Sequence, residues 1–501
     1  MMRRLLLPLC LAVCLGLPSP GAALAPDADW TPIATGIDFR EYSLPGPNHV
    51  FVARMDRNNP QVILDAGLAQ GNLAEGTEVV SSIADRYHEA INTWGEVWGQ
   101  RNQVVVAING SFFDRKSGVP WSGLIQSGWY AKRYGSLAGS SGFVWTLERN
   151  AFIGECVDHR PERQVVKFLI GGETLPIDGV NVAREHDALI LYTPQFDQTT
   201  RTSESGFEVL VEMTRPTTIL PLPAMAYGYV REIRDHLEAA EIPFDHVVLS
   251  AGGKSVNALR NAARLGELVG ISMEITDLGE DCKSPDPHDW TKAYAGLGGS
   301  FVFLKDGEIV EVDEPGAVVR NPRTAVCFNS DYIHFIVVDG RAEGYSVGMD
   351  MGELGKFCRK QLDDEWGLNQ DGGGSSTMWI DGVVRNRPSD GWERPVANAL
   401  MMIVVEPVER STAFHPGQRV AVTSPSDLWL GPGTNNWVRS TLLPTTQGIV
   451  VPHINGLDGV LAKGTYWWKV GFGKTVGWVP EWALSPSTGE TKGVPEIFVQ
   501  P

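Results

Sequence analysis

The segment from Asn369 to Met378 has the sequence Asn-Gln-Asp-Gly-Gly-Gly-Ser-Ser-Thr-Met and lies between a predicted helix and a predicted hairpin. A run of three glycines costs stability, because glycine loses more backbone freedom on folding than any other residue. Close approach of a ligand to the main chain is one reason to keep such a run, since N–H groups in a turn of this kind can hold an anion such as phosphate. A flexible turn is the competing interpretation, and the glycine run alone favours that alternative.

Regular structure is predicted on both sides of this segment. The stretch from Met351 to Trp366 has an apolar stripe at helical spacing, and Gly367 can end that helix. Beyond the glycines, Asp381-Gly382 is a turn signal that predicts a hairpin between Met378–Ile380 and Val383–Val384. The apolar stripe of the helix consists of Leu354, Phe357, Cys358 and Leu362.

Further along the chain, helices and strands are mixed. Thr77 to about Trp98 is predicted as an amphipathic helix, followed by a short buried strand at Val104–Ile108. A second hairpin is predicted at Asp306-Gly307. The pattern favours an α+β fold with a mixed or antiparallel sheet and flanking helices, and it lacks the regular βα alternation of a barrel.

The length of 501 residues suggests more than one domain. We expect a large domain at residues 30–407, a small all-β domain at residues 414–485 and a loosely ordered tail at 486–501. The small domain resembles a bacterial SH3-like barrel in the stretches Leu428–Thr434, Trp468–Val470 and Gly477–Val479. The resemblance implies attachment to the cell wall or to a partner, and a purely structural appendage is the alternative.

The N-terminus is typical of an export signal. Arg3 and Arg4 precede an apolar run from Leu5 to Leu17, which is too short to span a membrane. We therefore predict a signal peptide at residues 1–25, with cleavage after Ala23 as the other option, and a secreted, periplasmic or cell-surface protein. No later stretch is long and apolar enough to predict a transmembrane anchor.

Four cysteines remain after this processing. An even number in an exported chain permits two disulfides with three connectivities, and free buried thiols are the competing interpretation. The four are Cys156, Cys282, Cys327 and Cys358.

The charge balance narrows the class of ligand. Sixty acidic residues against 42 basic ones give a formal net charge of −18, which argues against general nucleic-acid binding. A local group of arginines can still bind an anionic substrate, because arginine matches phosphate with two parallel hydrogen bonds. Candidates flank predicted strands at Arg320, Arg323 and Arg341 and follow the glycine run at Arg394. Surface ion pairing is the alternative for any single arginine.

Five motifs in order make the sequence similar to the phosphodiester glycosidase family over about Val104 to Val405. The glycine-rich core from Asp371 to Thr377 is the most specific of them, and Gln370 is a small departure where the family commonly has Leu. The motifs are Ala107–Asp114, Arg323–Ala325, Val338–Arg341 with Ser346, Gly348 and Met349, Asn369–Met378, and Asn386 with Pro388, Ser389, Asp390 and Arg394. The family includes a lysosomal enzyme whose disulfide-rich C-terminal region has no counterpart here, so a trafficking role is not implied.

The resemblance implies a secreted hydrolase that cleaves a sugar-1-phosphodiester in a glycan or polysaccharide. Such a reaction needs groups that hold the leaving phosphate and a carboxylate that meets the oxocarbenium-like sugar. We expect Asp371 or Asp114 to be that carboxylate. The expected substrate-binding residues are Asn109, Arg323, Asp339, Arg341, Gly372, Gly373, Gly374, Ser375, Ser376, Thr377, Asn386 and Arg394. A divalent cation is compatible with the many acidic residues, although no ligand spacing demands one and no cofactor is certain.

Two other functions remain open at this point. A catalytically silent protein could bind a cell-wall or extracellular polysaccharide in the same pocket. A phosphodiesterase could cut the P–O bond instead of the C–O bond. The sequence does not separate these alternatives from a glycosidase.

Overall fold

The computed structural model describes residues 29–74, 76–96, 98–134, 141–154, 157–158, 161–216, 220, 223–237, 239–274, 277–278 and 288–489. The predicted signal peptide, Cys156, Cys282 and most of the predicted tail lie outside these residues. Strands make up 45% of the chain and helices 11%, so the protein is mostly β. The prediction of antiparallel sheets is confirmed. The predicted α+β class with flanking helices overstated the helical content, because few helices accompany the sheets.

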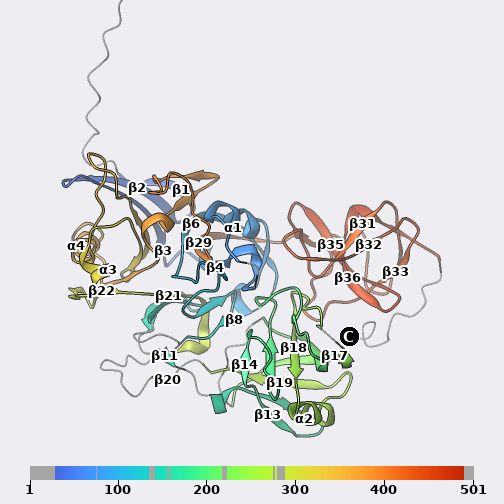
Figure 1. Cartoon of the computed structure of the whole chain (residues 1–501). Coiled ribbons are helices and arrows are strands. Elements are labelled where there is room, and N and C mark those ends of the chain that lie inside the picture. Colours follow the sequence, from blue (N-terminus) through green and yellow to red (C-terminus); the bar gives the residue numbers. More distant parts are fainter. Residues whose placement is uncertain are drawn as a thin grey trace, which may run out of the picture.

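Three sheets form the body that carries the glycine-rich segment (Figure 1). The first, here called the α4 sheet, contains in order β1 (Thr31–Ala34), β2 (Ile37–Leu44), β3 (Asn48–Asp56), β25 (Tyr332–Val338), β24 (Arg323–Phe328), β26 (Trp366–Asn369), β22 (Val302–Lys305) and β23 (Glu308–Ile309). The central sheet contains β28 (Val383–Val384), β27 (Met378–Ile380), β6 (Gln100–Asn109), β29 (Asn398–Pro407) and β4 (Val62–Leu68), with β5 (Ile91–Asn92) beside β6. The short sheet contains β10 (Ala151–Gly154), β9 (Ser141–Thr146), β21 (Ala293–Gly299), β7 (Leu124–Gln126) and β8 (Trp129–Lys132).

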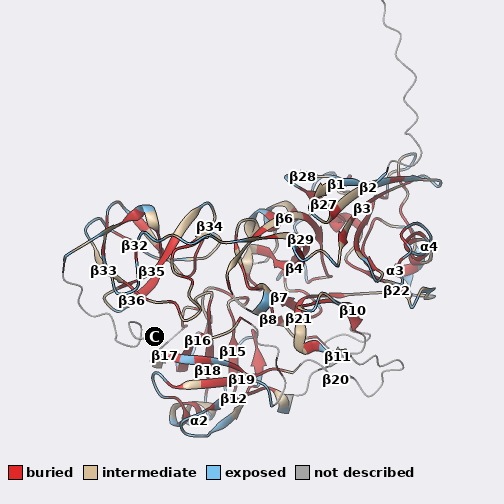
Figure 2. Cartoon of the chain, turned by 180° about the vertical axis from the view of Figure 1, so that it is seen from behind, coloured by how far each residue is buried: buried red, intermediate tan, exposed pale blue. Residues whose placement is uncertain are grey.

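These sheets share one apolar core. Side chains such as Phe335 of the α4 sheet, Ile108 of the central sheet and Trp145 of the short sheet are fully buried in it. The opposite face of the α4 sheet is covered by helices α3 (Pro315–Val318) and α4 (Met351–Gln361). Figure 2 shows that much of the strand surface in this body is buried. The ends of β6 and β26 therefore lie on a rigid support.

Two further sheets lie beside this body (Figure 1). The inserted sheet contains β13 (Thr174–Pro176), β12 (Val165–Phe168), β19 (Leu268–Ser272), β17 (Ala226–Leu237), β16 (Gly206–Met213), β18 (His246–Ala251), β15 (Leu189–Tyr192) and β14 (Gly179–Val180), and it is flanked by helix α2 (Ser255–Ala262). The C-terminal sheet contains β32 (Val438–Leu442), β31 (Ser426–Trp429), β36 (Thr475–Pro480), β35 (Thr465–Phe472), β33 (Gln447–Val450), β30 (Arg419–Val422) and β37 (Leu484–Pro486), with β34 (Val460–Ala462) beside β35. A separate ribbon pairs β11 (Val157–Asp158) with β20 (Asp277–Leu278).

Several local predictions can be compared with this structure. The hairpins at Asp306-Gly307 and Asp381-Gly382 are confirmed, as is the strand at Val104–Ile108, which lies within β6. Among the described strands, β14 and β15 form the only parallel pair. The helix predicted from Met351 is α4; it begins with a capping box between Asp350 and Glu353 and ends earlier than expected, at Gln361.

The long helix predicted from Thr77 to Trp98 was wrong in its second half. Helix α1 spans only Val80–Tyr87. Glu89 then adopts a left-handed backbone conformation with φ 59°, which ends the helix. Ile91 lies in β5 beside β6, so pairing with the central sheet replaces the helical continuation. Among the described residues, no helix has the length and hydropathy needed to cross a membrane.

The C-terminal sheet packs directly on the inserted sheet. Trp467 and Trp478 are buried in the same apolar cluster as Val211 and Val247 of the inserted sheet. The backbone N–H of Phe244 also donates to the carbonyl of Leu430 at 3.2 Å. The small all-β region is thus fixed to its neighbour, while its likeness to an SH3 barrel stays a prediction.

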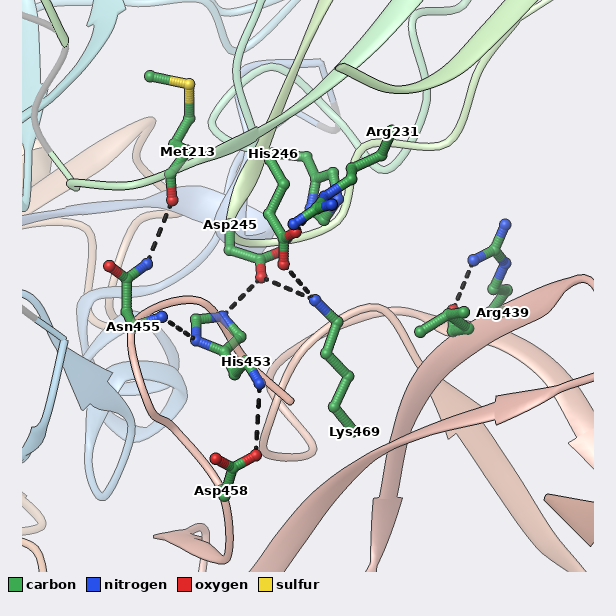
Figure 3. Close-up of polar contacts among 11 residues, drawn as sticks. Met213, Arg231, Asp245, His246, Arg439, His453, Asn455, Asp458 and Lys469 are labelled. Atoms are coloured by element: carbon green, nitrogen blue, oxygen red, sulfur yellow. Dashed lines mark hydrogen bonds and ion pairs between the residues drawn. The ribbon is translucent and has the colours of Figure 1, made fainter. Parts of the chain in front are cut away.

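A buried charge network crosses this contact (Figure 3). The Lys469 ammonium of β35 lies 2.5 Å from the Glu212 carboxylate of β16 and 3.5 Å from Asp245. Asp245 also contacts His453 at 2.7 Å and His246 at 2.5 Å. Burial is the largest influence on the pKa of Glu212 and raises it, but the charges of Lys469, His246 and Arg231 together lower that pKa to about 2. The Lys469 ammonium therefore forms ion pairs with two buried carboxylates of the other sheet, and Arg231 adds a second cation at Glu212.

We predict that Lys469→Met lowers the free energy of unfolding by about 3 kcal/mol, because it removes the buried ammonium that Glu212 and Asp245 share and leaves Glu212 with Arg231 as its cation. Urea unfolding measures the change. Lys474→Met is the matched control, since Lys474 is exposed in the same sheet region, and it should change stability by less than about 0.5 kcal/mol. A loss below about 1 kcal/mol in Lys469→Met would show that the network does not hold the two sheets together.

Candidate functional site

Asp371 lies just beyond the end of β26, between the α4 sheet and the central sheet. Its backbone N–H donates to the carbonyl of Gly110 at 3.0 Å, and its own carbonyl accepts from Asn109 Nδ2 at 2.6 Å. The carboxylate Oδ2 accepts from the Ser375 hydroxyl at 2.7 Å. Burial raises the pKa of Asp371, although the Ser375 hydrogen bond and the charges of Arg394 and Arg115 oppose that rise. The site thus holds a carboxyl group that titrates above its ordinary range.

The three glycines are explained by close neighbours. A Cβ on Gly372 would lie 2.7 Å from the carbonyl oxygen of Pro322, and a Cβ on Gly373 would lie 2.9 Å from Arg341 Nη2. A Cβ on Gly374 would overlap the guanidinium of Arg394. Gly373 also has φ 65°, a backbone conformation that favours glycine. The run therefore allows the loop to pack tightly against two arginines, and it is not simply a flexible turn.

The same loop is not an open cradle of N–H groups. The N–H of Gly373 donates to the Pro322 carbonyl at 2.9 Å. Those of Ser375 and Ser376 each donate within the loop at 3.3 Å, and that of Thr377 donates to Asn109 Oδ1 at 3.1 Å. These four donors are used by the protein itself. These four N–H groups are not available to a phosphate, so the exposed arginine side chains are the better placed anion ligands.

Arg394 is held beside Asp371 by an acidic neighbour. Its Nε and Nη2 donate to Asp390 Oδ2 at 2.9 and 2.7 Å, and its Nη1 lies 3.5 Å from the Ser375 hydroxyl. Arg394, Ser375 and Asp371 thus form a continuous polar chain. The guanidinium remains partly exposed, so it can contact an anion from solvent.

Arg341 also lies beside the loop. Its backbone is left-handed with φ 60°, and its Nε and Nη2 donate to Asn321 Oδ1 at 3.3 and 3.1 Å. The residue is exposed beside Gly373. Two guanidinium groups consequently lie beside consecutive glycines of the run, Arg341 at Gly373 and Arg394 at Gly374.

Asn109 and Asn386 act as braces in this structure. Asn109 is fully buried, and its Oδ1 accepts from the Thr324 hydroxyl at 2.7 Å. Asn386 donates to the Ser376 carbonyl at 3.0 Å and accepts from the N–H of Met378 at 2.8 Å. Their amide groups are occupied by the chain, so they position the loop.

Asp339 supports the second brace. Its Oδ1 accepts from Asn386 at 3.0 Å and its Oδ2 accepts from the Tyr345 hydroxyl at 3.0 Å. Burial raises the pKa of Asp339, partly offset by these hydrogen bonds. The carboxylate is nearly inaccessible and therefore holds Asn386 in place.

Arg323 occupies a different environment from the one expected for a phosphate ligand. Its Nε donates to the Met349 carbonyl at 2.8 Å, and its Nη2 donates to the carbonyls of Gly316 and Val319 at 2.9 and 2.6 Å. Burial lowers the pKa of Arg323 to about 10. The guanidinium ties β24 to the region of α3, on the helix-covered side of the sheet. We therefore remove it from the set of anion ligands.

Asp114, the other predicted carboxylate, is exposed on the loop that follows β6. Its Oδ1 accepts from the N–H groups of Ser117 and Lys116 at 2.8 and 2.9 Å. These hydrogen bonds lower the pKa of Asp114. The pKa of Asp114 is thus shifted downward and that of Asp371 upward, by turn hydrogen bonds in the first case and by burial in the second.

Further polar and aromatic groups near the glycine run have surroundings that the sequence did not predict, and Trp392 was not among the predicted site residues. Asp390 orients Arg394, and Trp392 is 70% exposed only two residues before that arginine. The hydroxyls of Ser376 and Thr377 and the amide of Gln370 are buried without hydrogen-bond partners among the described residues. Gln370 stands where the family commonly has Leu, so its buried amide is a polar group that an apolar residue would not place beside Asp371. That departure from the family pattern was the sequence feature that pointed to Gln370.

Two groups of potential metal ligands occur in the described part of the chain. One contains Cys327, Cys358 and Asp364, and the other contains Glu212, Asp245 and His453. Cys327 and Cys358 are buried and free, which agrees with the thiol alternative for this pair. Neither group includes a predicted site residue, and in the second the Lys469 ammonium already supplies a positive charge.

Comparison with known proteins identifies part of the chain. Residues 237–403 match the family model described as phosphodiester glycosidase, so this segment carries a domain of that family. It includes Asp371, Arg341 and Arg394, whereas Asn109 and Asp114 precede it. No curated protein matches the chain.

Three solved structures are similar to this one. A hypothetical protein from Synechocystis has a TM-score of 0.50 at 18% identity, over 76% of this chain and 64% of that protein. The chain thus spans less than two thirds of that relative, and the likeness concerns the fold alone. A putative exported protein from Burkholderia pseudomallei gives 0.46 at 18% identity over 71% and 74% of the two chains. The catalytic domain of zebrafish N-acetylglucosamine-1-phosphodiester alpha-N-acetylglucosaminidase gives 0.33 at 13% identity over 73% and 81%.

We predict that Gly374→Ala lowers the free energy of unfolding by about 1–3 kcal/mol, because the new methyl group must displace Arg394 or the loop. Thermal or urea unfolding measures this. The control is Gly352→Ala in α4, where the added Cβ has only an ordinary contact 3.4 Å from Asp350 and should stabilise by about 0.5 kcal/mol. Equal stability of Gly374→Ala and the wild type would contradict the tight packing of this loop.

Proposed function

We propose that the chain hydrolyses a sugar-1-phosphodiester by cleaving the bond between the anomeric carbon and the bridging oxygen. The observation that carries this proposal is Asp371, a carboxyl group with a raised pKa that accepts a hydrogen bond from Ser375, with the charge of Arg394 near it and Arg341 beside the adjoining glycine run. The match of residues 237–403 to the phosphodiester glycosidase family supports the reaction class.

In this proposal the exposed arginine side chains bind the phosphate. Arg341 and Arg394 lie beside consecutive glycines of the run and carry the positive charge that a leaving phosphate needs. The Ser375 hydroxyl lies between Arg394 and Asp371 and orients both. Since a phosphate leaves more easily than an alkoxide, charge stabilisation by arginine contributes more than strong protonation.

In this proposal Asp371 acts as the general base. A raised pKa brings a carboxyl group closer to the pH at which it can both release and accept a proton. In the proposed step, water forms the new bond to the anomeric carbon, and the phosphate keeps the bridging oxygen as it leaves. Asp371 accepts the proton of the water. Ionised Asp114, on the loop that begins at Gly110, supplies negative charge toward the oxocarbenium-like sugar.

Sugar binding has candidate platforms at the surface. Trp392 is 70% exposed close to Arg394, and Trp121 is 49% exposed shortly after Asp114. Exposed indole rings are suited to stack on the apolar faces of a sugar. We therefore propose that these two residues contact carbohydrate on the two sides of the site.

The proposal also places the reaction outside the cytoplasm. The basic Arg3 and Arg4 followed by a short apolar run support export of the chain. A polysaccharide or cell-surface glycan is then the accessible class of substrate.

Asp371→Asn is expected to lower kcat by at least about 10³-fold while the protein stays folded, because the amide cannot accept a proton. Turnover of a chromogenic sugar-1-phosphodiester and the thermal unfolding curve measure the two effects. Asp306→Asn, at the tip of the hairpin joining β22 and β23, is the matched control and should keep wild-type activity. A near wild-type rate in Asp371→Asn would remove this carboxyl group from the chemistry.

Hydrolysis in oxygen-18 water tests which bond breaks. Attack at the anomeric carbon places the label in the sugar, because the phosphate retains the bridging oxygen. Mass spectrometry of both products reads the position, and an unlabelled phosphate is the expected result. Label in the phosphate would mean that the enzyme is a phosphodiesterase. Glycan binding without any turnover would instead favour the catalytically silent alternative.

A further inference from the structure

A cavity of about 750 Å³ opens between the body of the protein and the inserted sheet. One wall comes from Leu73 and Val119 of the body, and the facing wall comes from the region of β14 and β15. Its volume is that of a typical small-molecule site. None of its lining residues is Asp371, so it is a separate feature of the molecule.

The two body segments that line the cavity both lead to the candidate site. Val119 accepts a hydrogen bond from the N–H of Asp114 at 2.9 Å, and Gly110, at the start of the same loop, accepts from Asp371 at 3.0 Å. The segment after Leu73 reaches Glu78, which bridges to Val396, two residues beyond Arg394. The loop from Gly110 to Val119 therefore joins the cavity to Asp371, and the bridge of Glu78 to Val396 adds a second connection near Arg394.

The inserted sheet gives the cavity an apolar lining. Val180, Val182, Tyr192 and Phe196 all line it. Val182 is 47% exposed, so part of this aliphatic side chain is accessible to a ligand in the cavity. A ligand that carries an apolar stretch would cover this surface and gain hydrophobic stabilisation.

Cations surround this apolar lining. Lys132, Arg133, Arg184 and Arg201 line the cavity, whereas Glu204 is the one acidic residue among its lining side chains in the described chain. Arg201 is paired with buried Asp197, and Arg184 lies 4.0 Å from Glu208. Within the described residues, no ion pair joins Lys132 to a carboxylate, and burial lowers the pKa of Lys132. An anionic group would therefore be favoured at Lys132.

We propose that this cavity binds the aglycone of the substrate, and that the aglycone is an amphipathic group with an apolar stretch and a negative charge. The assignment rests on the proposed function. Cleavage at the anomeric carbon leaves the aglycone as a phosphate monoester, since the bridging oxygen stays on phosphorus. An alkyl phosphate reproduces the apolar stretch and one anionic group of such an aglycone, and its binding to the cavity can be tested without turnover.

The experiment is calorimetric titration of the full chain with n-decyl phosphate and with methyl phosphate. We expect decyl phosphate to bind at least ~10-fold more tightly, because the apolar lining is covered only by the longer chain. Lys132→Met, which keeps the side-chain length and removes the charge, should weaken decyl phosphate binding by about 10-fold. Val182→Asp should weaken it similarly by placing a like charge at the cavity. Lys360→Met, an exposed lysine on α4, is the control and should bind as the wild type does.

Equal affinity for the two phosphates, or unchanged affinity in both cavity variants, would overturn the assignment. Loss of binding in Arg394→Ala together with full binding in Lys132→Met would also overturn it, since the probe would then occupy the Asp371 site alone. The binding of decyl phosphate to the cavity can be measured whether or not the protein hydrolyses a phosphodiester. If decyl phosphate binds as expected and no diester is hydrolysed, the proposed function fails while an amphipathic-anion site remains.

Discussion

The side chain of Asn109 is the contact on which the arrangement of the candidate site depends. It is fully buried at the end of β6, where its Oδ1 accepts from Thr324 of the α4 sheet and from the N–H of Thr377, and its Nδ2 donates to the carbonyl of Asp371. One amide group thus connects the central sheet, the α4 sheet and the loop between them. A buried amide that loses such partners leaves several polar groups unsatisfied, so its replacement would disturb all three elements together. The position of Asp371 is consequently set by the packing of two sheets rather than by the local conformation of a glycine-rich turn.

The glycine run has its physical reason in this same packing. With the loop fixed against Pro322, there is no space for a Cβ at Gly372, and Arg341 and Arg394 occupy the space beside the next two glycines. The absent side chains allow two guanidinium groups to lie close to the backbone of the loop that follows Asp371. That arrangement concentrates positive charge in a protein whose overall charge is −18. Local charge of this kind can select an anionic substrate even where the distant surface is acidic.

The sequence indicated the members of this site better than their roles. Strong local signals, such as the Asp-Gly hairpin turns and the apolar stripe of α4, predicted elements that the structure contains. The helix predicted through Trp98 failed because strand pairing of Ile91 with β6 outweighed its helical spacing, and such long-range pairing leaves no local pattern. Arg323 was expected to bind phosphate for a similar reason: its position beside a strand was visible, but the face of the sheet on which its side chain lies was not. The inserted sheet was also missed as a unit, because its strands are brought together from residues far apart in the chain.

The inserted sheet contacts both the cavity beside the body and the C-terminal sheet. On one side it lines the cavity that includes Val119, and on the other it carries Glu212 and Asp245, which both form ion pairs with Lys469 of the C-terminal sheet. A tethered anchor would be joined to the body by a linker alone, with a polar surface facing the rest of the chain. Here buried tryptophans and a buried ion network join the two sheets, so separation would expose apolar surface and remove Lys469 from these carboxylates. The C-terminal sheet is therefore better understood as a support that holds the inserted sheet, and with it the outer wall of the cavity, against the body of the protein.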